Sequence, residues 1–274
     1  MRFHASHLLI FPLLILPAHA DPILGTAGSF GVLAGSNIAN VGASTVTGNV
    51  GVAPGTVITG FPPGTATGTI YSAGGVATQA QTDATAAYNG LAGMAVTDTL
   101  TGTDLGGLTL TPGVYEFASS AQLTGALTLD GEGNDNALWV FLIGSTLTTA
   151  SGSSVSVTDS GPNDGIFWDV GSSATLGTTT EFEGNILASA SIALDNGATI
   201  GCGSALASTG AVTMNTNTIS TGCNGGGTLA NGVITALPAT STPGTSTVPE
   251  PASIFLFGSG LVSLAGWGRR KLRK

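Results

Sequence analysis

Three consecutive stretches of the chain repeat one pattern of short apolar segments. They read FWDVGSSATLGTTTEF over residues 167–182, NILASASIALDNGATI over 185–200 and SALASTGAVTMNTNTI over 204–219. Corresponding apolar positions recur at nearly equal intervals, at Leu176, Leu194 and Met214. A period of about 20 residues with short strands in each repeat is typical of a solenoid, whose stacked repeats share one core. Because each copy holds three apolar segments, we expect a β-helix with three faces per coil.

The pattern extends beyond these copies. Residues 108–219 form the main run of coils, and the Gly- and Thr-rich residues 21–70 predict irregular coils of the same solenoid. Trp139 to Ile143 is a continuous apolar run, as expected for a strand covered on both faces. Residues 76–94 are rich in Ala and Gln, with apolar side chains at helical spacing. We therefore predict an all-β-dominated fold with one long α-helix packed along a face.

The charged residues are few and unevenly placed. Only 8% of the 274 residues are charged, against about 25% in typical globular domains. All Lys, Arg and His residues lie either at or before His19 or at or after Arg269, so residues 21–248 contain none. Nucleic-acid binding requires cations, and most hydrolytic chemistry uses His, Lys or Arg. We therefore expect no nucleic-acid partner and no enzymatic activity.

The remaining polar groups suit few cofactors. Zinc and copper sites of the usual His/Cys kind are excluded, which leaves Ca²⁺ as the only metal worth considering. The acidic run from Asp130 to Asn136 lacks EF-hand spacing, and we interpret it as a turn insertion. Asp169, Glu181 and Glu183 form the one close acidic group among the coils, without a basic partner. We expect no metal and no cofactor.

The amino terminus predicts export. Arg2 supplies a positive start, residues 8–16 an apolar run and Ala18-His19-Ala20 a cleavage site, which together indicate a signal peptide over residues 1–20. Export favours oxidised cysteines. Cys202 and Cys223 are separated by the length of one coil, and neighbouring coils about 4.8 Å apart suit a disulfide. We predict a bridge between adjacent coils.

The carboxyl terminus resembles a PEP-CTERM sorting signal. Residues 236–248 form a Gly-, Ser-, Thr- and Pro-rich linker, and residues 249–274 follow with Pro249-Glu250-Pro251, a mostly apolar run over 252–267 and a basic end. The resemblance implies a Gram-negative bacterium, cleavage by an exosortase, and a mature protein at the cell surface or secreted. An ordinary membrane anchor is the alternative, although about 20 apolar residues are needed to span a bilayer.

The domain over residues 21–235 resembles the ice-binding protein family. The resemblance is carried by Leu24 to Ala27, Phe30 to Gly35, Thr47 to Gly51, Ile58 to Gly64, Leu110 to Tyr115, Ile143 to Leu147, Gly184 to Ala188 and Gly210 to Thr213. It implies a right-handed, discontinuous β-solenoid with a long helix along one face. It also implies that a flat face bearing Thr and small residues binds an ice crystal, and we expect a monomer.

The family's ice-binding motif is Thr, then Ala or Gly, any residue, then Thr or Asn. Its nearest matches here predict a row of outward side chains across neighbouring coils, which we call the first ladder. The row consists of the residues just before the buried Val155, Phe182, Ile200 and Ile219, and one of them, Glu181, introduces a carboxylate. The candidate ice-binding residues are Thr149, Ser154, Thr178, Thr180, Asn196, Thr199, Thr216, Thr218, Thr45, Thr56 and Thr69. A second ladder comprises Thr109, Thr128, Thr148, Thr175, Ala193 and Thr213.

Two functions follow from these patterns. The first is an exported ice-binding (antifreeze) protein that inhibits ice growth or recrystallisation. The alternative is a cell-surface or matrix protein, structural or adhesive, that keeps the fold without the ice face. A carbohydrate-binding adhesin would require exposed aromatic side chains, but Trp139 and Trp168 both lie in core-like strands.

Overall fold

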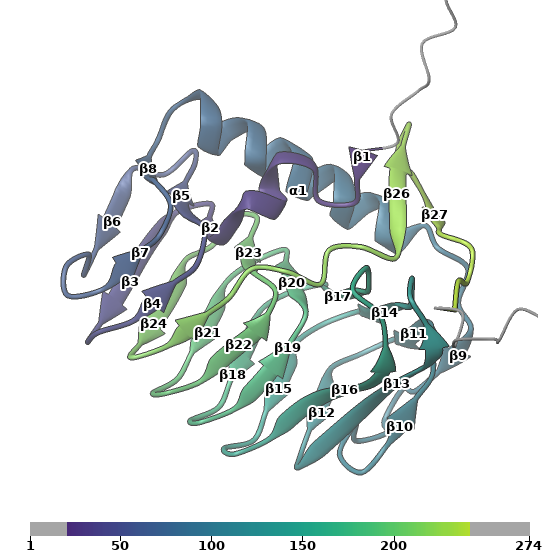
Figure 1. The fold of residues 1–274 in the computed structure, drawn as a ribbon. Coiled ribbons are helices and arrows are strands. Elements are labelled where there is room, and N and C mark those ends of the chain that lie inside the picture. The colour runs from purple at the N-terminus through teal and green to yellow at the C-terminus, as the bar shows by residue number, and fades with distance from the viewer. Residues whose placement is uncertain (1–20, 242–274) are drawn as a thin grey trace, which may run out of the picture. The chain divides into compact units, whose positions relative to one another are not determined.

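The computed structural model describes residues 21–241, drawn in Figure 1 as stacked three-stranded coils beside one helix. The predicted signal peptide, the sorting segment and most of the linker lie outside the described residues. Within the described part of the chain, no helix is both long and apolar enough to cross a membrane.

Three parallel sheets form the faces of the solenoid, named here in the order in which each coil enters them. The nine-stranded first sheet runs β8 (Ile70–Ser72), β5 (Asn49–Val52), β2 (Phe30–Ala34), β23 (Ala205–Ala207), β20 (Asn185–Ala188), β17 (Gly165–Val170), β14 (Leu138–Ile143), β11 (Gly113–Phe117) and β9 (Asp98–Thr99). The seven-stranded second sheet runs β12 (Ala121–Leu123), β15 (Leu147–Thr149), β18 (Ala174–Leu176), β21 (Ile192–Leu194), β24 (Val212–Asn215), β3 (Asn37–Val41) and β6 (Val57–Thr59).

The eight-stranded third sheet runs β10 (Thr109–Leu110), β13 (Ala126–Asn134), β16 (Ser154–Ser160), β19 (Glu181–Glu183), β22 (Thr199–Cys202), β25 (Thr218–Ile219), β4 (Thr45–Val46) and β7 (Thr65–Ala66). A small antiparallel sheet joins β1 (Asp21–Pro22), β26 (Gly227–Ala230) and β27 (Val233–Ala236), and the 3-10 helix η1 spans Gly25–Ser29.

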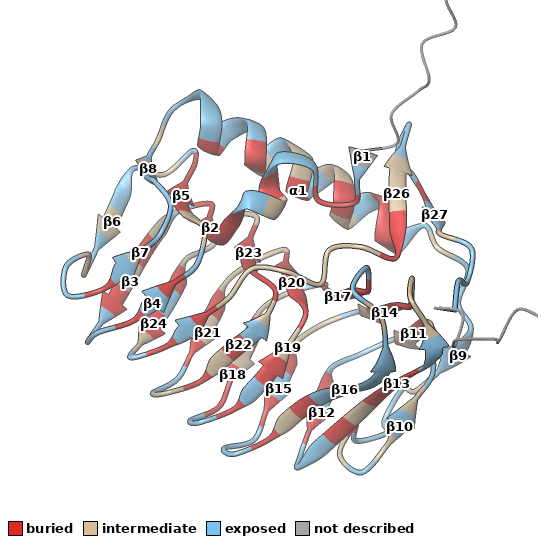
Figure 2. Ribbon diagram, viewed as in Figure 1, coloured by how far each residue is buried: buried red, intermediate tan, exposed pale blue. Residues whose placement is uncertain are grey.

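The strand register confirms the repeat that the sequence predicts. Leu176 pairs with Leu194, and Phe182 pairs with Ile200, which pairs with Ile219. These side chains are buried, and Figure 2 shows burial alternating with exposure along the strands. The interior also contains an aromatic stack, in which the Phe141 and Trp168 ring centroids lie 3.8 Å apart. The stacked coils therefore share one core, as a repeat that cannot bury its own apolar face requires.

The order of stacking differs from the order of the sequence. The amino-terminal coils pack against the last coil, because β2 pairs with β23, β3 with β24 and β4 with β25. The amino-terminal coils end with β8, which is the edge strand on one side of the first sheet. The next strand in the sequence, β9, is the edge strand on the opposite side. The discontinuity that the family resemblance implies is thus present.

Helix α1 (Gly75–Ala92) carries the chain from one end of the stack to the other, close to the predicted range of 76–94. Its buried face consists of Ala77, Ala80, Ala84, Ala87, Gly90 and Leu91. Small side chains let the helix approach the first sheet, where Val140 and Phe167 pack in the same cluster. Trp139 and Phe141 belong instead to the interior cluster, so β14 is covered on both faces as predicted.

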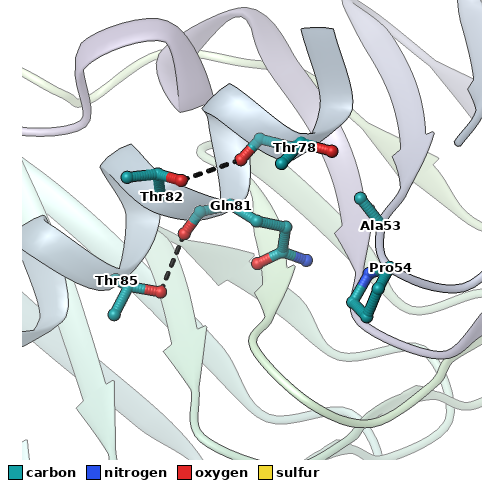
Figure 3. A pocket seen from close by; sticks show the side chains of 6 residues that line it. All are labelled: Ala53, Pro54, Thr78, Gln81, Thr82 and Thr85. Carbon is teal, nitrogen blue, oxygen red and sulfur yellow. Dashed lines mark hydrogen bonds between the residues drawn. The ribbon is translucent and has the colours of Figure 1, made fainter. Parts of the chain in front are cut away.

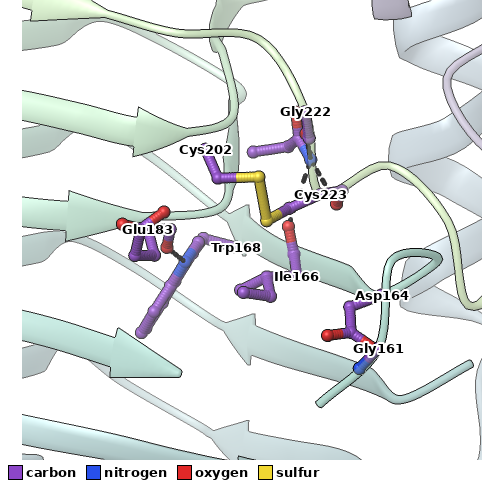
Figure 4. Close-up of a disulfide and its surroundings, with 9 residues drawn as sticks. Gly161, Asp164, Ile166, Trp168, Glu183, Cys202, Gly222 and Cys223 are labelled. Atoms are coloured by element: carbon purple, nitrogen blue, oxygen red, sulfur yellow. Dashed lines mark hydrogen bonds between the residues drawn. A yellow bond between two sulfur atoms is a disulfide. The ribbon is translucent and has the colours of Figure 1, made fainter. Parts of the chain in front are cut away.

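A disulfide joins the last two coils of the main run. Cys202 ends β22, Cys223 follows β25, and their Cα atoms lie 5.5 Å apart (Figure 4). The predicted bridge is confirmed. It lies beside Glu183, whose carboxyl pKa is raised by burial, although a hydrogen bond from the Cys202 main chain acts to lower it.

We predict that replacing both cysteines with Ser lowers the free energy of unfolding by about 3 kcal/mol, because the bridge closes a loop of about 20 residues in the unfolded chain. Urea denaturation of the oxidised protein and of the double variant measures the difference. Equal unfolding free energies would contradict a stabilising role for the bridge.

Candidate functional site

The third sheet presents an outward row of hydroxyl side chains with one carboxylate among them. The register aligns Ser154, Glu181, Thr199, Thr218, Thr45 and Thr65 across β16, β19, β22, β25, β4 and β7. Ser154 and Thr199 are half-buried and the other four are exposed. The expected outward positions before Val155, Phe182, Ile200 and Ile219 are therefore correct, and four consecutive strands continue the row with Thr.

A second row follows two residues later on the same face. Thr47 and Thr67 are exposed, and their main-chain nitrogens donate to Ile219 O and Val46 O at 2.8 and 2.9 Å. Thr47 and Thr67 directly follow β4 and β7, so each strand end has two exposed Thr residues around one apolar residue that packs against the core. Thr67 Oγ1 also accepts from Gly48 N at 2.9 Å. We call Thr199, Thr218, Thr45, Thr65, Thr47 and Thr67 the threonine array.

The array occupies the part of the third sheet without ionisable side chains. The strands β22, β25, β4 and β7 contain no acidic residue. Glu181 and Glu183 on β19 form the border, and Asp130 and Asp159 lie farther along, on β13 and β16. The carboxylate of Glu181 therefore lies at the edge of the array, next to Thr199, and does not divide it.

Two predicted members of the first ladder lie on other faces. Thr56 precedes β6 of the second sheet, and Thr69 precedes β8 of the first sheet. Both satisfy the pattern of a Thr before a β-branched residue, but that pattern does not distinguish the three faces. Thr65, on β7, is the residue that continues the third-sheet row after Thr45. Its signal in the sequence is the Thr-x-Thr pattern that it shares with Thr45, one coil earlier.

The corner between the second and third sheets contains the remaining candidates. Thr178, Asn196 and Thr216 are exposed there, and Asn196 Nδ2 donates to Asn215 Oδ1 at 3.3 Å. At successive corners one residue has a left-handed backbone conformation, namely Gly42, Gly152, Thr179, Gly197 and Thr216. Glycine adopts this conformation without strain, which explains Gly at three of these five corners, whereas Thr179 and Thr216 adopt it with a Cβ present. The corner is therefore a repeated turn that sets the start of each third-sheet strand.

Thr149 and Thr180 cannot contact a surface, which corrects their prediction as ice-binding residues. They are 3% and 0% exposed, and their hydroxyls lie 2.8 Å apart inside the corner. Thr149 Oγ1 accepts from Gly177 N at 2.9 Å, and Thr180 Oγ1 donates to Ala150 O at 3.2 Å. The Thr149 hydroxyl thus gives Gly177 N a partner, and the Thr180 hydroxyl adds a second donor to Ala150 O, which also accepts from Ser153 N at 3.2 Å.

The second ladder combines two faces. Thr148, Thr175, Ala193 and Thr213 form one row on the second sheet, which continues to Ala39 and Thr59. Thr109 and Thr128 pair with each other on β10 and β13 of the third sheet. The second-sheet row is regular and free of charge, but Ala interrupts it at two of these six positions.

Two other features resemble binding sites. Among the described residues Glu183, Cys202 and Cys223 form the one group with metal-ligand spacing, but both sulfurs are bonded to each other. The acidic run after Asp130 interrupts the register of β13 and ends in a turn at Asp135 and Asn136, as the sequence predicts. Asp130 Oδ1 accepts from Glu132 N at 3.0 Å. Its carboxylate thus serves the local backbone.

A groove of about 340 Å³ lies between α1 and Pro54 (Figure 3). The Thr82 and Thr85 hydroxyls donate to main-chain carbonyls one turn earlier in the helix, and the Thr78 hydroxyl donates to Gly74 O just before it. Gln81 Nε2 donates to Ala207 O at 3.0 Å. These hydrogen bonds hold the helix together and against the coils.

Comparisons with known proteins agree with this geometry. The Ice-binding-like family model matches residues 32–220, and the PEP-CTERM protein-sorting motif matches residues 247–274. An ice-binding protein of Nostoc sp. is 53% identical over 92% of this chain and 88% of its own length. One from Colwellia sp. is 38% identical over 72% of this chain and 82% of its own.

Solved structures show the same architecture. The crystal structure of an ice-binding protein from the Antarctic ascomycete Antarctomyces psychrotrophicus superposes with a TM-score of 0.68 and 43% identity, covering 72% of this chain and 96% of that one. The sorting motif marks the chain for export to the cell surface or beyond.

We predict that Thr180→Val lowers the free energy of unfolding by about 1–3 kcal/mol, because it removes the buried hydroxyl from Thr149 and Ala150. The exposed neighbour Thr178→Val is the matched control and should change it by less than about 0.5 kcal/mol. Urea denaturation measures both. Equal effects would show that Thr180 does not support the corner.

Proposed function

The chain belongs to the ice-binding-like family, and on that premise we propose that it adsorbs to ice through the threonine array and inhibits ice growth or recrystallisation. The observation that carries the proposal is the uninterrupted Thr register from Thr199 through Thr218 and Thr45 to Thr65. The relatives named above are ice-binding proteins, and four consecutive strands of the array each present a Thr in this register.

The physical basis is the regular spacing of the array. Parallel strands repeat at about 4.8 Å, so their outward Thr side chains form a flat grid. Each Thr combines a methyl group, which orders adjacent water, with a hydroxyl that can join the ordered lattice. Carboxylates hold their own hydration shell tightly, and the four strands of the array contain none.

We infer that the sorting motif determines where this surface is used. A PEP-CTERM segment at residues 247–274 supports cleavage by an exosortase in a Gram-negative bacterium and a mature protein held at, or released from, the cell surface. The signal peptide proposed over residues 1–20 would start this route. The absence of Lys, Arg and His from residues 21–248 argues against a nucleic-acid partner or an enzyme, and we propose that the protein acts as a monomer.

The second candidate is a structural protein of the cell surface, favoured by the exposed carboxylate of Glu181 beside Thr199. In this account the fold is kept and the ice face is weakened. An adhesin that stacks sugars on aromatic rings gains no support from Trp139 and Trp168, which are fully buried.

We predict that Thr218→Tyr removes most of the thermal hysteresis and the inhibition of recrystallisation, because the ring disrupts the flat array. Thr213→Tyr is the matched control, since both residues are exposed and belong to the same coil, but Thr213 lies on the second sheet. Loss of activity in Thr213→Tyr alone would transfer the ice-binding role to the second sheet. An inactive parent would refute ice binding.

We predict that Glu181→Thr increases thermal hysteresis, because it extends the Thr row by one strand and removes a hydrated carboxylate. Glu116→Gln, on the first sheet, removes a carboxylate without touching the array and should leave activity unchanged. Unchanged activity in Glu181→Thr would show that the array ends at Thr199. Activity that arises only in Glu181→Thr would support the structural-protein candidate.

A further inference from the structure

Three buried polar side chains lie in the corner between the second and third sheets. Asn40 is 7% exposed, and Ser44 and Asn217 are each 1% exposed. Ser44 directly precedes Thr45, and Asn217 directly precedes Thr218. A buried polar group costs free energy unless its hydrogen bonds are made, so the partners of these side chains indicate what they hold in place. We call Asn40, Ser44 and Asn217 the corner network.

Asn217 joins two neighbouring corners. Its Nδ2 donates to Asp195 O at 2.8 Å and to Ala198 O at 2.9 Å, one coil earlier, where the chain turns into Thr199. Its Oδ1 accepts from Asn215 N on its own coil. The side chain thus fixes the starts of β22 and β25 relative to each other.

Ser44 and Asn40 continue the network into the two amino-terminal coils. Ser44 Oγ accepts from Asn217 N at 2.9 Å and donates to Asn40 Oδ1 at 2.6 Å. Asn40 Nδ2 donates to Gly42 O at 2.9 Å and to Gly60 O at 2.8 Å, and Gly60 lies in the corner before β7. The hydrogen bonds therefore link four successive corners, which are the corners that precede the four strands of the threonine array.

The strands of the array are short where the two sets of coils meet. β25 and β4 are two residues long, and Ser44 and Asn217 lie 173 positions apart in the sequence. Few main-chain hydrogen bonds therefore align two coils that are not consecutive in the sequence. A network of buried polar groups with all its partners makes the local structure rigid and unique, and this one lies next to the outward Thr row.

We propose that Asn217, Ser44 and Asn40 are positioning residues for ice binding, which set the height and spacing of the first-row Thr side chains without touching the crystal. This inference rests on the role proposed above for the threonine array. A binding surface must be held within about 0.5 Å of its productive geometry by supporting hydrogen bonds. A small displacement of one strand would thus reduce the match to the rigid ice lattice while the domain stays folded.

The test compares Ser44→Ala with Thr149→Val in the purified protein. Ser44→Ala removes the partner of Asn217 N and of Asn40 Oδ1, whereas Thr149→Val removes a buried hydroxyl from the same kind of corner in a coil outside the array. Both variants should lower Tm by a few degrees. Near the freezing point, where circular dichroism shows both to be folded, Ser44→Ala should lose most of its thermal hysteresis and Thr149→Val should keep the value of the parent.

Two further variants separate position from stability. Ser44→Thr keeps the hydroxyl and should retain the hysteresis that Ser44→Ala loses. Asn40→Ala cuts the link to Gly60, should also lower hysteresis, and takes the place of Ser44→Ala if that variant does not fold. Amide hydrogen exchange reports on the network directly, because Asn217 N loses its acceptor in Ser44→Ala and should exchange faster than in the parent.

Three results would overturn the proposal. Equal losses of hysteresis in Ser44→Ala and Thr149→Val would show that only stability matters. Faster exchange at Asn217 with unchanged hysteresis would show that the array does not depend on the network. A folded Ser44→Thr as inactive as Ser44→Ala would show that the hydroxyl is not the determinant. An inactive parent would instead refute the proposed function itself, and the positioning role with it.

Discussion

Main-chain hydrogen bonds between β4 and β25 join two parts of the chain that are far apart in sequence. Thr45 N donates to Asn217 O and Thr47 N donates to Ile219 O, each at 2.8 Å. Inside the same joint Asn217 N donates to Ser44 Oγ at 2.9 Å. This joint makes one continuous stack from two sets of coils. The threonine array lies across it, with Thr199 and Thr218 on one side and Thr45 and Thr65 on the other.

The same joint explains the helix. Because the amino-terminal coils stack on the last coil, the chain must return from β8 to β9, across the whole nine-stranded sheet. That sheet is about 38 Å wide at about 4.8 Å per strand. The 18 residues of α1 span about 27 Å of it, and the flanking segments cover the rest. The helix then buries the outward row of the first sheet, including Asp169, in a domain that contains no basic side chain to pair with it.

The sequence predicts the coil but not the order in which coils stack. The interval between Leu176, Leu194 and Met214 gives the length of a coil, and the three apolar segments in each copy predict three strands per coil. Periodicity contains no information about which coil contacts Thr45, and this depends on the return of the helix. A Thr before a β-branched residue also occurs on all three faces, so this pattern misses Thr65 and assigns Thr56 and Thr69 to the wrong face.

Side-chain direction is also only partly predictable. The alternation of Thr199 with Ile200 and of Thr218 with Ile219 correctly predicts outward Thr residues, since a strand alternates its faces. At the corner no such alternation applies, because a left-handed residue reverses the direction of the chain. Thr180 therefore points inward to Thr149, although a Thr-rich motif alone favours a surface position.

The most direct test of the central claim is magic-angle-spinning NMR of the Thr-labelled protein frozen in ice, following proton polarisation as it spreads from ice to the Thr methyl groups. Our account predicts that Thr45, Thr65, Thr199 and Thr218 receive it first, since their side chains would touch the crystal. Earlier transfer to Thr148, Thr175 and Thr213 would show that the second sheet binds ice, and would contradict the role assigned to the threonine array.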